Sequence, residues 1–360
     1  MTIYINGKFV AQATTGVQRV AASLVTALDT LPEVAKGGWV LLHPRGVVPP
    51  RLGRIGARPV GAANLPPHVW EQLVLPWAAR DGMLLNLAGS APAFARRQLC
   101  EVHDAAVFDD PVTYTRQFRV WYRCMFQWLA WRRVPFLTVS EFSRLNLMRH
   151  LKLDASDIAV LPNGADHLDA VVADPGVLHR LALQQTTYLL VVAGDSASKN
   201  LPRLLQAFSR LPPSMCCKLV MVGDANRRVF RQAACGSDPV GVLRAGRVAD
   251  PELKTLYQHA AALVIPSLYE GFGLPVVEAM RLGCPVVASN AAALPEVCAG
   301  AALLFDPSSI DAITAALVQV LGDMPLRQRL RKAGQQRTEA LSWQMAARQL
   351  HGHVAGAIRP

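Results

Sequence analysis

Short apolar segments alternate with helical segments along the whole chain. Runs of aliphatic and β-branched residues predict strands over residues 2–5, 39–43, 83–87, 136–139, 158–161, 188–193, 219–223, 263–266, 285–289 and 302–305. Apolar residues spaced three and four apart predict helices between them, over residues 17–31, 201–211, 252–262 and 275–282. This alternation indicates an α/β protein whose parallel sheets carry helices on both faces.

The strand–helix alternation occurs twice, and a chain of 360 residues is long enough for two cores. The pattern breaks over the polar residues 165–179, so we expect a linker there. We predict a Rossmann-like domain over residues 1–168, a second over 176–342, and a final helix over 343–360 that returns to the first domain. Ser342 is the expected N-cap of that helix. Ligands of such sheets bind beyond the carboxyl ends of the strands, so strand-to-helix loops are the positions of interest.

The charge is strongly positive, with 37 Lys and Arg against 26 Asp and Glu, and both halves share the excess. This balance suits an anionic substrate, an anionic membrane surface or nucleic acid. Nucleic acid is the weakest of the three, because the chain has no zinc-finger spacing and no RNA-binding aromatic signature. The seven cysteines include no CxxC pair, which is typical of a reducing cytoplasm. We expect neither a signal peptide nor a transmembrane helix.

The most informative segment covers residues 266–289. Gly271 and Gly273 allow backbone amides to approach a ligand, and Pro275 is well placed as a first helical residue. The start of that helix is an anion site, and Glu270 and Glu278 can both accept hydrogen bonds from sugar hydroxyls. Each feature alone is weak, because the helix dipole by itself favours such a glutamate by roughly 0.3–1 kcal/mol. The combination carries the interpretation.

The segment resembles the E-x7-E signature of the retaining GT-B glycosyltransferases of family 4. Further similar stretches lie at residues 138–144, 161–164, 199–205, 246–260, 294–297 and 303–307. The resemblance implies two Rossmann-like parallel-sheet domains that face each other across a cleft, and a nucleotide-sugar donor as co-substrate. We expect no metal and no cofactor, since the chain has no DxD in a suitable loop and no His/Cys grouping.

The resemblance also implies roles for individual residues. Glu278 would hold the donor ribose, Glu270 would lie beside the transferred sugar, and Lys199 would neutralise the departing diphosphate. The backbone around the glycines would line the sugar and phosphate pocket, at Gly271, Phe272, Gly273 and Leu274. A lysine near a helix start is mildly unfavourable for the helix, which favours a functional role for Lys199.

The chain departs from the family at Asp195, where many relatives have a second phosphate-binding arginine. Arg247 and Arg19 are the candidates to supply that charge. Gly16 resembles the glycine whose backbone approaches the donor phosphates, although an ordinary turn explains a single glycine equally well. His103 resembles the family's active-site histidine beside the transferred sugar. A lone histidine is more often structural, but its place in a strand-end loop favours function.

The implied reaction is a hexosyl transfer with retention, by front-face attack of the acceptor hydroxyl. GDP-mannose is the first choice of donor, because similar bacterial proteins build exopolysaccharide or the O-antigen of lipopolysaccharide. UDP-glucose, or another nucleotide sugar such as a GlcNAc donor, is the alternative. The acceptor would be a glycan or a lipid-linked sugar.

Residues 111–140 contain arginines and aromatic residues but no acid. They predict an amphipathic helix, which either lies on an anionic membrane at the inner face of the plasma membrane or packs its aromatic side on the sheet.

Three rival functions remain open. An NAD-dependent oxidoreductase needs a GxGxxG loop after its first strand, and residues 14–20 contain only Gly16. A non-catalytic GT-B-like protein would bind nucleotide or a partner without turnover. A phosphorylase or epimerase on the same fold would cleave or isomerise a sugar instead of transferring it.

Overall fold

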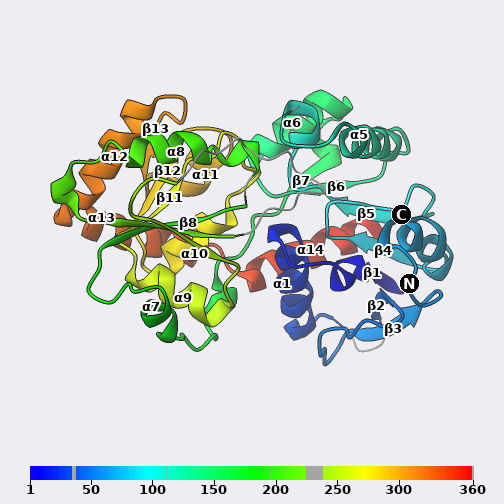
Figure 1. Cartoon of the computed structure of the whole chain (residues 1–360). Helices are drawn as coiled ribbons and strands as arrows, with labels where there is room; N and C mark the ends of the chain where they lie inside the picture. Colours follow the sequence, from blue (N-terminus) through cyan, green and yellow to red (C-terminus); the bar gives the residue numbers. More distant parts are fainter. Residues whose placement is uncertain (35–37, 111, 195, 224–237, 359–360) are drawn as a thin grey trace. The chain divides into compact units, whose positions relative to one another are not determined.

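The structure, a computed structural model, describes residues 1–34, 38–110, 112–194, 196–223 and 238–358. The chain divides into two compact units (Figure 1). Unit 1 consists of Met1–Ala105, Val120–Gly164 and Ser342–Pro360, and unit 2 of Ala106–Arg119 and Ala165–Leu341. The last segment of the chain therefore belongs to unit 1, and Ala106–Arg119, part of the first predicted domain, belongs to unit 2.

Unit 1 contains a seven-stranded sheet in the order β3-β2-β1-β4-β5-β6-β7, with neighbouring strands parallel. Its strands are β1 (Ile3–Asn6), β2 (Trp39–Pro44), β3 (Gly56–Val60), β4 (Met83–Asn86), β5 (Gln98–Glu101), β6 (Phe136–Thr138) and β7 (Ile158–Val160). Strands are added on one side of β1 and then, from β4, on the other. This reversal makes the carboxyl ends of β1 and β4 a topological switch point.

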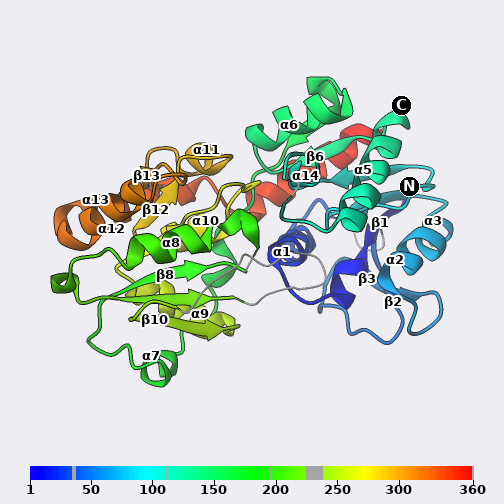
Figure 2. The same cartoon turned by 45° about the horizontal axis from the view of Figure 1, so that its top comes forward.

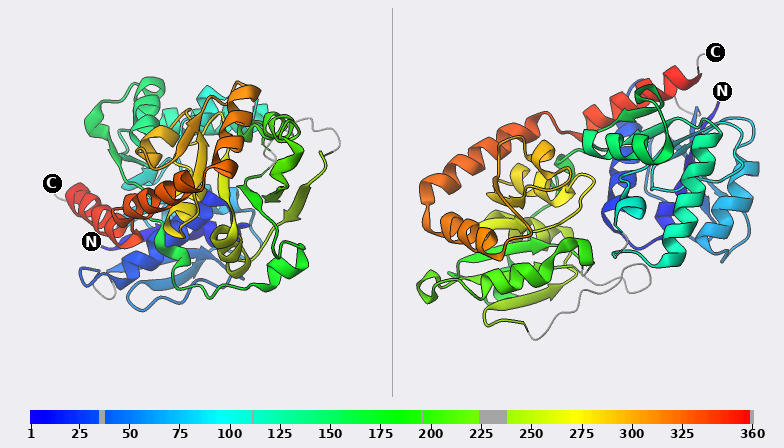
Figure 3. Two further views of the ribbon diagram at one scale, coloured as in Figure 1. Left: turned by 90° about the vertical axis from the view of Figure 1, so that its left-hand side faces the viewer. Right: turned by 90° about the horizontal axis from the view of Figure 1, so that it is seen from above.

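The helical segments of unit 1 cover both faces of this sheet. They are η1 (Gly7–Ala11), α1 (Gly16–Thr30), α2 (Pro67–Val69), the π-helical turn η2 (Trp70–Val74), α3 (Leu75–Ala78), α6 (Glu141–Leu151), η3 (Ala155–Asp157) and α14 (Trp343–Ile358). One core cluster joins Tyr4, Leu42 and Leu84 of the strands to Trp70 and Leu75. Helix α14 packs beside α1, as Figure 3 shows in red and blue.

Unit 2 contains a six-stranded parallel sheet in the order β10-β9-β8-β11-β12-β13. Its strands are β8 (Tyr188–Val192), β9 (Lys218–Val222), β10 (Val242–Gly246), β11 (Ala262–Ile265), β12 (Val286–Ser289) and β13 (Leu303–Phe305). The order reverses between β8 and β11, so this sheet also has a switch point at the carboxyl ends of two central strands.

The helical segments of unit 2 are α4 (Ala106–Asp109), η4 (Asp166–Leu168), α7 (Gly176–Arg180), η5 (Ala197–Lys199), α8 (Leu201–Phe208), η6 (Pro213–Met215), α9 (Asp250–His259), α10 (Leu274–Arg281), α11 (Leu294–Cys298), α12 (Ile310–Gly322) and α13 (Met324–Glu339). Helices α8 and α12 pack together on one face of the sheet (Figure 2). Alternate strand residues such as Leu189 and Val191 enter that core, as a parallel strand buried on both faces requires. The helix α5 (Arg116–Trp131) begins in unit 2 and continues into unit 1.

Local signals place several helix ends where the structure has them. The Ser309 hydroxyl accepts from Ala312 N at 3.1 Å at the start of α12, and the Asp323 carboxylate accepts from Leu326 N at 2.8 Å at the start of α13. Ser342 Oγ accepts from Met345 N at 3.2 Å at the start of α14, which is the predicted N-cap. Among the described residues, no helix is long and apolar enough to cross a membrane.

The predicted α/β class with two parallel sheets is confirmed, and each predicted strand and helix overlaps an observed one. Three observed strands fall outside the predicted ranges: β3 and β10, each of which forms an edge of its sheet, and the short central strand β5. An edge strand is covered on fewer sides, so it needs no continuous apolar run. Strand β3 is mostly exposed and contains Pro59, so its sequence does not resemble a strand.

Candidate active site

Lys199 and Glu270 meet at the switch point of unit 2. Lys199 follows β8 in the short turn η5, and Glu270 lies in the loop after β11. Lys199 Nζ donates to Glu270 Oε1 at 2.6 Å, and Ser267 Oγ donates to the same oxygen at 2.7 Å. The two charged side chains are 26% and 15% exposed. Glu270 is therefore held by two hydrogen-bond donors, and both members of the ion pair are still reachable from solvent.

Backbone contacts hold the two loops together. Asn200 adopts a left-handed conformation with φ of 56°, which asparagine tolerates better than most residues. Its side-chain amide donates to Pro266 O at 3.0 Å and to Pro307 O at 2.8 Å. Leu268 N donates to Ser198 O at 2.8 Å. The position of Lys199 relative to Glu270 is thus set by the fold as well as by their ion pair.

The start of α10 is built around Gly273. This residue has φ of +88°, and a Cβ atom there would lie 2.8 Å from Leu294 Cδ2, so a larger residue would strain the backbone and displace Leu294. The helix begins at Leu274, one residue earlier than predicted, and Pro275 is its second residue. The neighbouring Gly271, Phe272 and Leu274 are buried. The amino end of α10 brings positive backbone charge to this loop.

Glu278 lies one turn into α10 and is 3% exposed. His167 Nε2 lies 2.9 Å from its Oε1, and the Tyr257 hydroxyl donates to its Oε2 at 2.7 Å. The carboxylate is thus buried with both oxygens paired, as a buried polar group should be. Glu278 and Glu270 have separate hydrogen-bond partners. No sequence signal points to either partner: His167 falls in the predicted linker, and Tyr257 is one of several apolar-facing residues of the predicted helix 252–262.

The segment Ala106–Arg119 is fastened to both loops of this site. Tyr269 directly precedes Glu270 in sequence, and its hydroxyl donates to Asp109 Oδ2 at 3.0 Å. Ser198 directly precedes Lys199, and its backbone N donates to Thr113 Oγ1 at 3.1 Å. No sequence pattern pointed to these contacts, because the partners lie 85 and 160 positions apart.

Arg247 is exposed and directly follows β10. Strand β9 separates β10 from β8, so Arg247 and the loop that carries Lys199 both follow carboxyl ends of strands at the same edge of the sheet. Asp195, the departure from the family pattern, lies outside the described residues. Among the residues that the structure does describe, no group of three or more His, Cys, Asp or Glu side chains could hold a metal ion.

Gly16 and Arg19 lie in the first turn of α1 in unit 1. Gln18 Oε1 accepts hydrogen bonds from the Thr15 backbone N at 3.3 Å and from the Thr15 hydroxyl. A Cβ atom on Gly16 would meet nothing within 4 Å, and its φ is not positive. Neither packing nor backbone conformation therefore requires glycine at this position.

His103 follows β5 in unit 1. Its Nε2 donates to Leu87 O at 3.4 Å, which leaves Nδ1 as the unprotonated acceptor, and its carbonyl accepts from Ser143 Oγ at 3.0 Å. Burial lowers the pKa of His103 to about 4, although the Leu87 hydrogen bond acts in the opposite direction. The imidazole is neutral at pH 7, and the Leu87 carbonyl favours the tautomer with the proton on Nε2.

A buried polar network fills the switch point of unit 1. Lys8 Nζ donates to Glu71 Oε2 at 2.8 Å and to the Ser90 hydroxyl. Glu71 Oε1 accepts from Ser90 Oγ at 2.8 Å and from Asn6 Nδ2 at 2.9 Å, and Asn6 Nδ2 also donates to Asn86 Oδ1 at 2.9 Å. Lys8 is 1% exposed and Glu71 0%. Sequence reasoning missed this network entirely.

Helix α5 has one buried side and several exposed aromatic residues, and its contact with a membrane stays a prediction. Met125, Phe126, Leu129 and Ala130 are buried, so one side belongs to the core. Trp121 is 46% exposed and Trp131 is 74% exposed, so the aromatic residues do not all pack inward.

Comparisons with known proteins agree with the resemblance. Residues 180–337 match the family model described as "Glycosyl transferases group 1". The chain is 32% identical over 281 residues to the O-antigen chain mannosyltransferase B of Escherichia coli, over 74% of this chain and 73% of that protein. It is also 32% identical over 229 residues to the MMP alpha-(1->4)-mannosyltransferase of Mycolicibacterium hassiacum, over 61% of this chain and 53% of that protein.

Among solved structures, the chain resembles HepE of Anabaena in complex with UDP-glucose. The TM-score is 0.69 at 16% identity, over 99% of each chain, which is a likeness of fold. The two parallel sheets with helices on both faces are the GT-B architecture. With a relative matched over about three quarters of its length, the chain belongs to the glycosyl transferases group 1 family and is a hexosyltransferase.

Proposed function

We propose that this protein is a retaining mannosyltransferase that moves mannose from GDP-mannose to a glycan or lipid-linked sugar in cell-surface polysaccharide biosynthesis. The observation that carries the proposal is the Lys199–Glu270 pair, 2.6 Å apart at the switch point of unit 2. Ligands of open α/β sheets bind at such a point. A cation and an anion that neutralise each other there are ready to exchange their contacts for a pyrophosphate and a sugar hydroxyl.

Each site residue has a role in the proposal. Lys199 takes the charge that grows on the diphosphate as it leaves, helped by the amino end of α10. Released from Lys199, Glu270 accepts from hydroxyls of the transferred sugar, and Glu278 accepts from the donor ribose. The resemblance assigns His103 to the transferred sugar. It assigns Gly16 and Arg19 to the donor phosphates, with Arg247 as the second candidate for an additional cation.

The proposed step is a front-face substitution. The bond between the anomeric carbon and the diphosphate oxygen breaks, and the acceptor hydroxyl oxygen forms its bond on the same face. The hydroxyl proton passes to the departing phosphate oxygen, and GDP leaves. Neutral His103 accepts through Nδ1 and cannot supply a full positive charge at pH 7. Cationic stabilisation of the leaving group therefore comes from Lys199, with Arg19 or Arg247 as the additional cation, and not from His103.

Mannose is the proposed sugar because O-antigen chain mannosyltransferase B is similar over most of its length. UDP-glucose is the competing donor, since HepE binds it on the same fold. A thermal-shift screen should separate them, because a ligand that binds the folded state raises its melting temperature. We expect GDP-mannose to give the larger shift, and UDP-glucose to bind weakly.

Turnover is tested by incubating the protein with GDP-mannose and glycan acceptors and following GDP release together with the product. NMR of the new glycosidic bond reports retention or inversion. A preference for UDP-glucose would contradict GDP-mannose as the donor. An inverted anomeric configuration in the product would contradict the front-face mechanism. Tight donor binding without transfer to any acceptor would favour a non-catalytic GT-B-like protein. If the Glu270→Ala and Lys199→Ala variants both retained full transfer activity, these residues would not form the active site.

The proposal includes peripheral contact with the anionic inner face of the plasma membrane, where a lipid-linked acceptor is available from the cytoplasm. Exposed Trp121 and Trp131 on the arginine-bearing α5 support it, because aromatic and basic side chains suit the interface. Sedimentation with anionic vesicles should exceed that with neutral vesicles, and Trp131→Ser should reduce it. Equal, negligible binding to both would remove this contact.

A further inference from the structure

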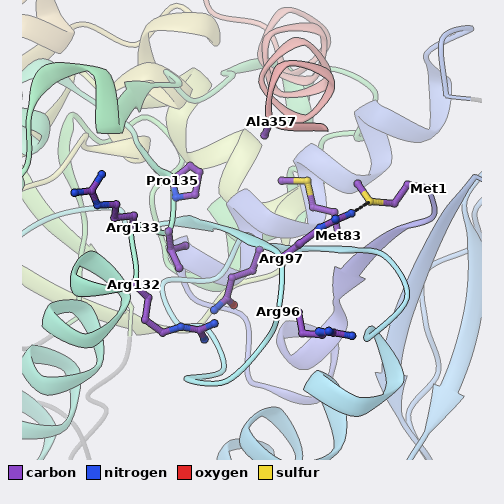
Figure 4. A pocket seen from close by; sticks show the side chains of 10 residues that line it. Met1, Met83, Arg96, Arg97, Arg132, Arg133, Pro135 and Ala357 are labelled. Atoms are coloured by element: carbon purple, nitrogen blue, oxygen red, sulfur yellow. Dashed lines mark hydrogen bonds between the residues drawn. The ribbon is translucent and has the colours of Figure 1, made fainter. Parts of the chain in front are cut away.

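A pocket of about 370 Å³ opens in unit 1 at the amino ends of the strands (Figure 4). Met83 and Gln98, the first residues of β4 and β5, line it, and Pro135 just before β6 lines it as well. It therefore lies at the opposite edge of the sheet from the switch point and from His103. Nothing in the proposed transfer reaction uses it.

The charged lining of this pocket is entirely basic. Four arginines line it and no acid does: Arg96, Arg97, Arg132 and Arg133. Like charges gathered in one pocket repel each other unless an anion joins them. Guanidinium groups are also the side chains best suited to hold phosphate oxygens.

These guanidinium groups have donors to spare. Arg132 Nη1 donates to Ala93 O at 2.7 Å and Ala95 O at 3.1 Å, which fixes the group and leaves its other nitrogens available. Arg97 Nη1 points to the thioether of Met1 at 3.3 Å, a weak acceptor. Arg96 and Arg133 are exposed, and within the described part of the chain their side chains make no ion pair or hydrogen bond.

The backbone conformation of Arg133 resembles that of Lys152 at the end of α6. Arg133 closes α5 in the left-handed region, with φ of 54°, where helices normally place glycine or asparagine. An arginine there is less favourable for the backbone than glycine. This conformation therefore carries no evidence for a site, but it makes a substitution by glycine at Arg133 comparable with one at Lys152.

We propose that the pocket binds an organic phosphate, in which a phosphate group is joined to an apolar portion. The arginines would take the phosphate, and Met1, Met83 and Val134 offer apolar surface beside them. The volume is at the low end for small-molecule pockets and exceeds the need of a bare phosphate ion. The phosphate belongs either to a soluble molecule or to a lipid head group. This site is separate from the donor diphosphate at Lys199, which belongs to unit 2.

The test uses two variants that change the backbone in the same way. Arg133→Gly removes a pocket cation at a left-handed position. Lys152→Gly is the matched control, since exposed Lys152 closes α6 with φ of 55° and does not line the pocket. Both substitutions relieve the backbone, so both variants should keep or raise the melting temperature. A change in binding that only Arg133→Gly shows is therefore not a folding effect.

Binding is measured on the full chain in two arms. The soluble arm titrates glycerol 3-phosphate by calorimetry, and the lipid arm sediments phosphatidylcholine vesicles with and without phosphatidic acid. We expect saturable binding in at least one arm. Arg133→Gly should weaken it roughly tenfold, as expected for one charged hydrogen-bond donor, and Lys152→Gly should leave it unchanged. The arm that responds identifies the source of the phosphate.

Lys199→Ala separates this site from the donor site. Retained phosphate binding in Lys199→Ala supports an independent pocket, whereas its loss would assign the phosphate to the donor site and overturn the proposal. Absence of binding in both arms would also overturn it. So would equal weakening by Arg133→Gly and Lys152→Gly, because general attraction to a basic surface would then explain the result.

Discussion

The two sheets use their switch points in different ways. In unit 2, the carboxyl ends of β8 and β11 present Lys199 and Glu270, which pair with each other and remain partly exposed. In unit 1, the carboxyl ends of β1 and β4 lead to Lys8 and Glu71, which also pair, but at 2% and 1% side-chain exposure. The same topology thus holds an accessible ion pair in one unit and a sealed one in the other.

The difference lies in what surrounds each pair. Glu71 accepts from Ser90 and Asn6 as well as Lys8, so the network satisfies its own charges inside the core. Lys199 has Glu270 as its counterion in a place that solvent and ligand can reach. A buried, satisfied pair specifies structure, whereas a reachable pair can exchange partners with a ligand. Substitutions in the two units should therefore have different effects, on stability in unit 1 and on activity in unit 2.

The largest effect is expected from Lys8→Met, which leaves Glu71 buried without its counterion. Breaking a buried ion pair typically costs about 3–5 kcal/mol of the free energy of unfolding. Urea unfolding measures the loss. The double variant Lys8→Met with Glu71→Gln should recover much of it, because no uncompensated charge then remains. A loss below about 1 kcal/mol in the single variant would mean that the network is not sealed.

Lys199→Ala should act on catalysis instead of stability. Removing one preorganised donor to developing negative charge costs about 10²–10³ in rate, near 3–4 kcal/mol. We expect that loss in kcat/KM, with a melting temperature close to that of the wild type. The control is Lys218→Ala, since Lys218 is a partly exposed lysine of unit 2 whose ammonium group donates to Ala182 O at 2.8 Å. If Lys199→Ala and Lys218→Ala were equally active, the Lys199–Glu270 pair would have a structural role, like the Lys8–Glu71 pair of unit 1.

How far each site could be predicted from sequence follows from the same contrast. Glu270, Gly273 and Glu278 lie within nine residues, so they can be recognised as one local sequence motif. Lys8 meets Glu71 and Ser90 from 63 and 82 positions away, and no local pattern marks any of the three. His167 and Tyr257 were missed for the same reason, although both contact a residue of the motif.

The fold was more predictable than the sites because central strands carry their own signal. A strand buried on both faces needs a continuous apolar run, as in Tyr188–Val192. The edge strands β3 and β10 lack that requirement and fall outside the predicted ranges. The short central strand β5 falls outside them too, because Gln98 and Glu101 interrupt its apolar run. The assignment of Ala106–Arg119 to unit 2 also had no signal, because it depends on contacts such as Tyr269 with Asp109.

Glu101→Met tests the one described buried carboxyl of unit 1 that lacks hydrogen bonds. No described residue bonds to either of its oxygens, and burial raises its pKa from 4.5 to about 8. Between those values the folded state holds a proton that the unfolded chain has lost, so stability falls as pH rises. From pH 5 to pH 7 the loss is about 3 kcal/mol, at about 1.4 kcal/mol per unit.

Glu101→Met should remove this loss, which urea unfolding at pH 5 and pH 7 can measure. His103 acts in the opposite sense, since its lowered pKa makes stability rise with pH between about 4 and 6.5. The comparison is therefore between the variant and the wild type, in which the His103 contribution cancels. Exposed Glu33→Met is the control and should leave the pH dependence unchanged. An identical slope in Glu101→Met would mean that buried water satisfies the carboxyl.

The smallest expected effect, from Tyr257→Phe, asks whether the buried Glu278 belongs to the reachable class or to the sealed one. The substitution removes the donor to Glu278 Oε2, and Tyr188→Phe removes an equally buried hydroxyl that donates to Leu256 O at 2.8 Å. Each should cost about 1 kcal/mol of stability. If Glu278 holds the donor ribose, its carboxylate must be correctly oriented, and only Tyr257→Phe should raise the donor KM, about fivefold, with kcat little changed. Equal KM values would make Glu278 a structural residue like Glu71.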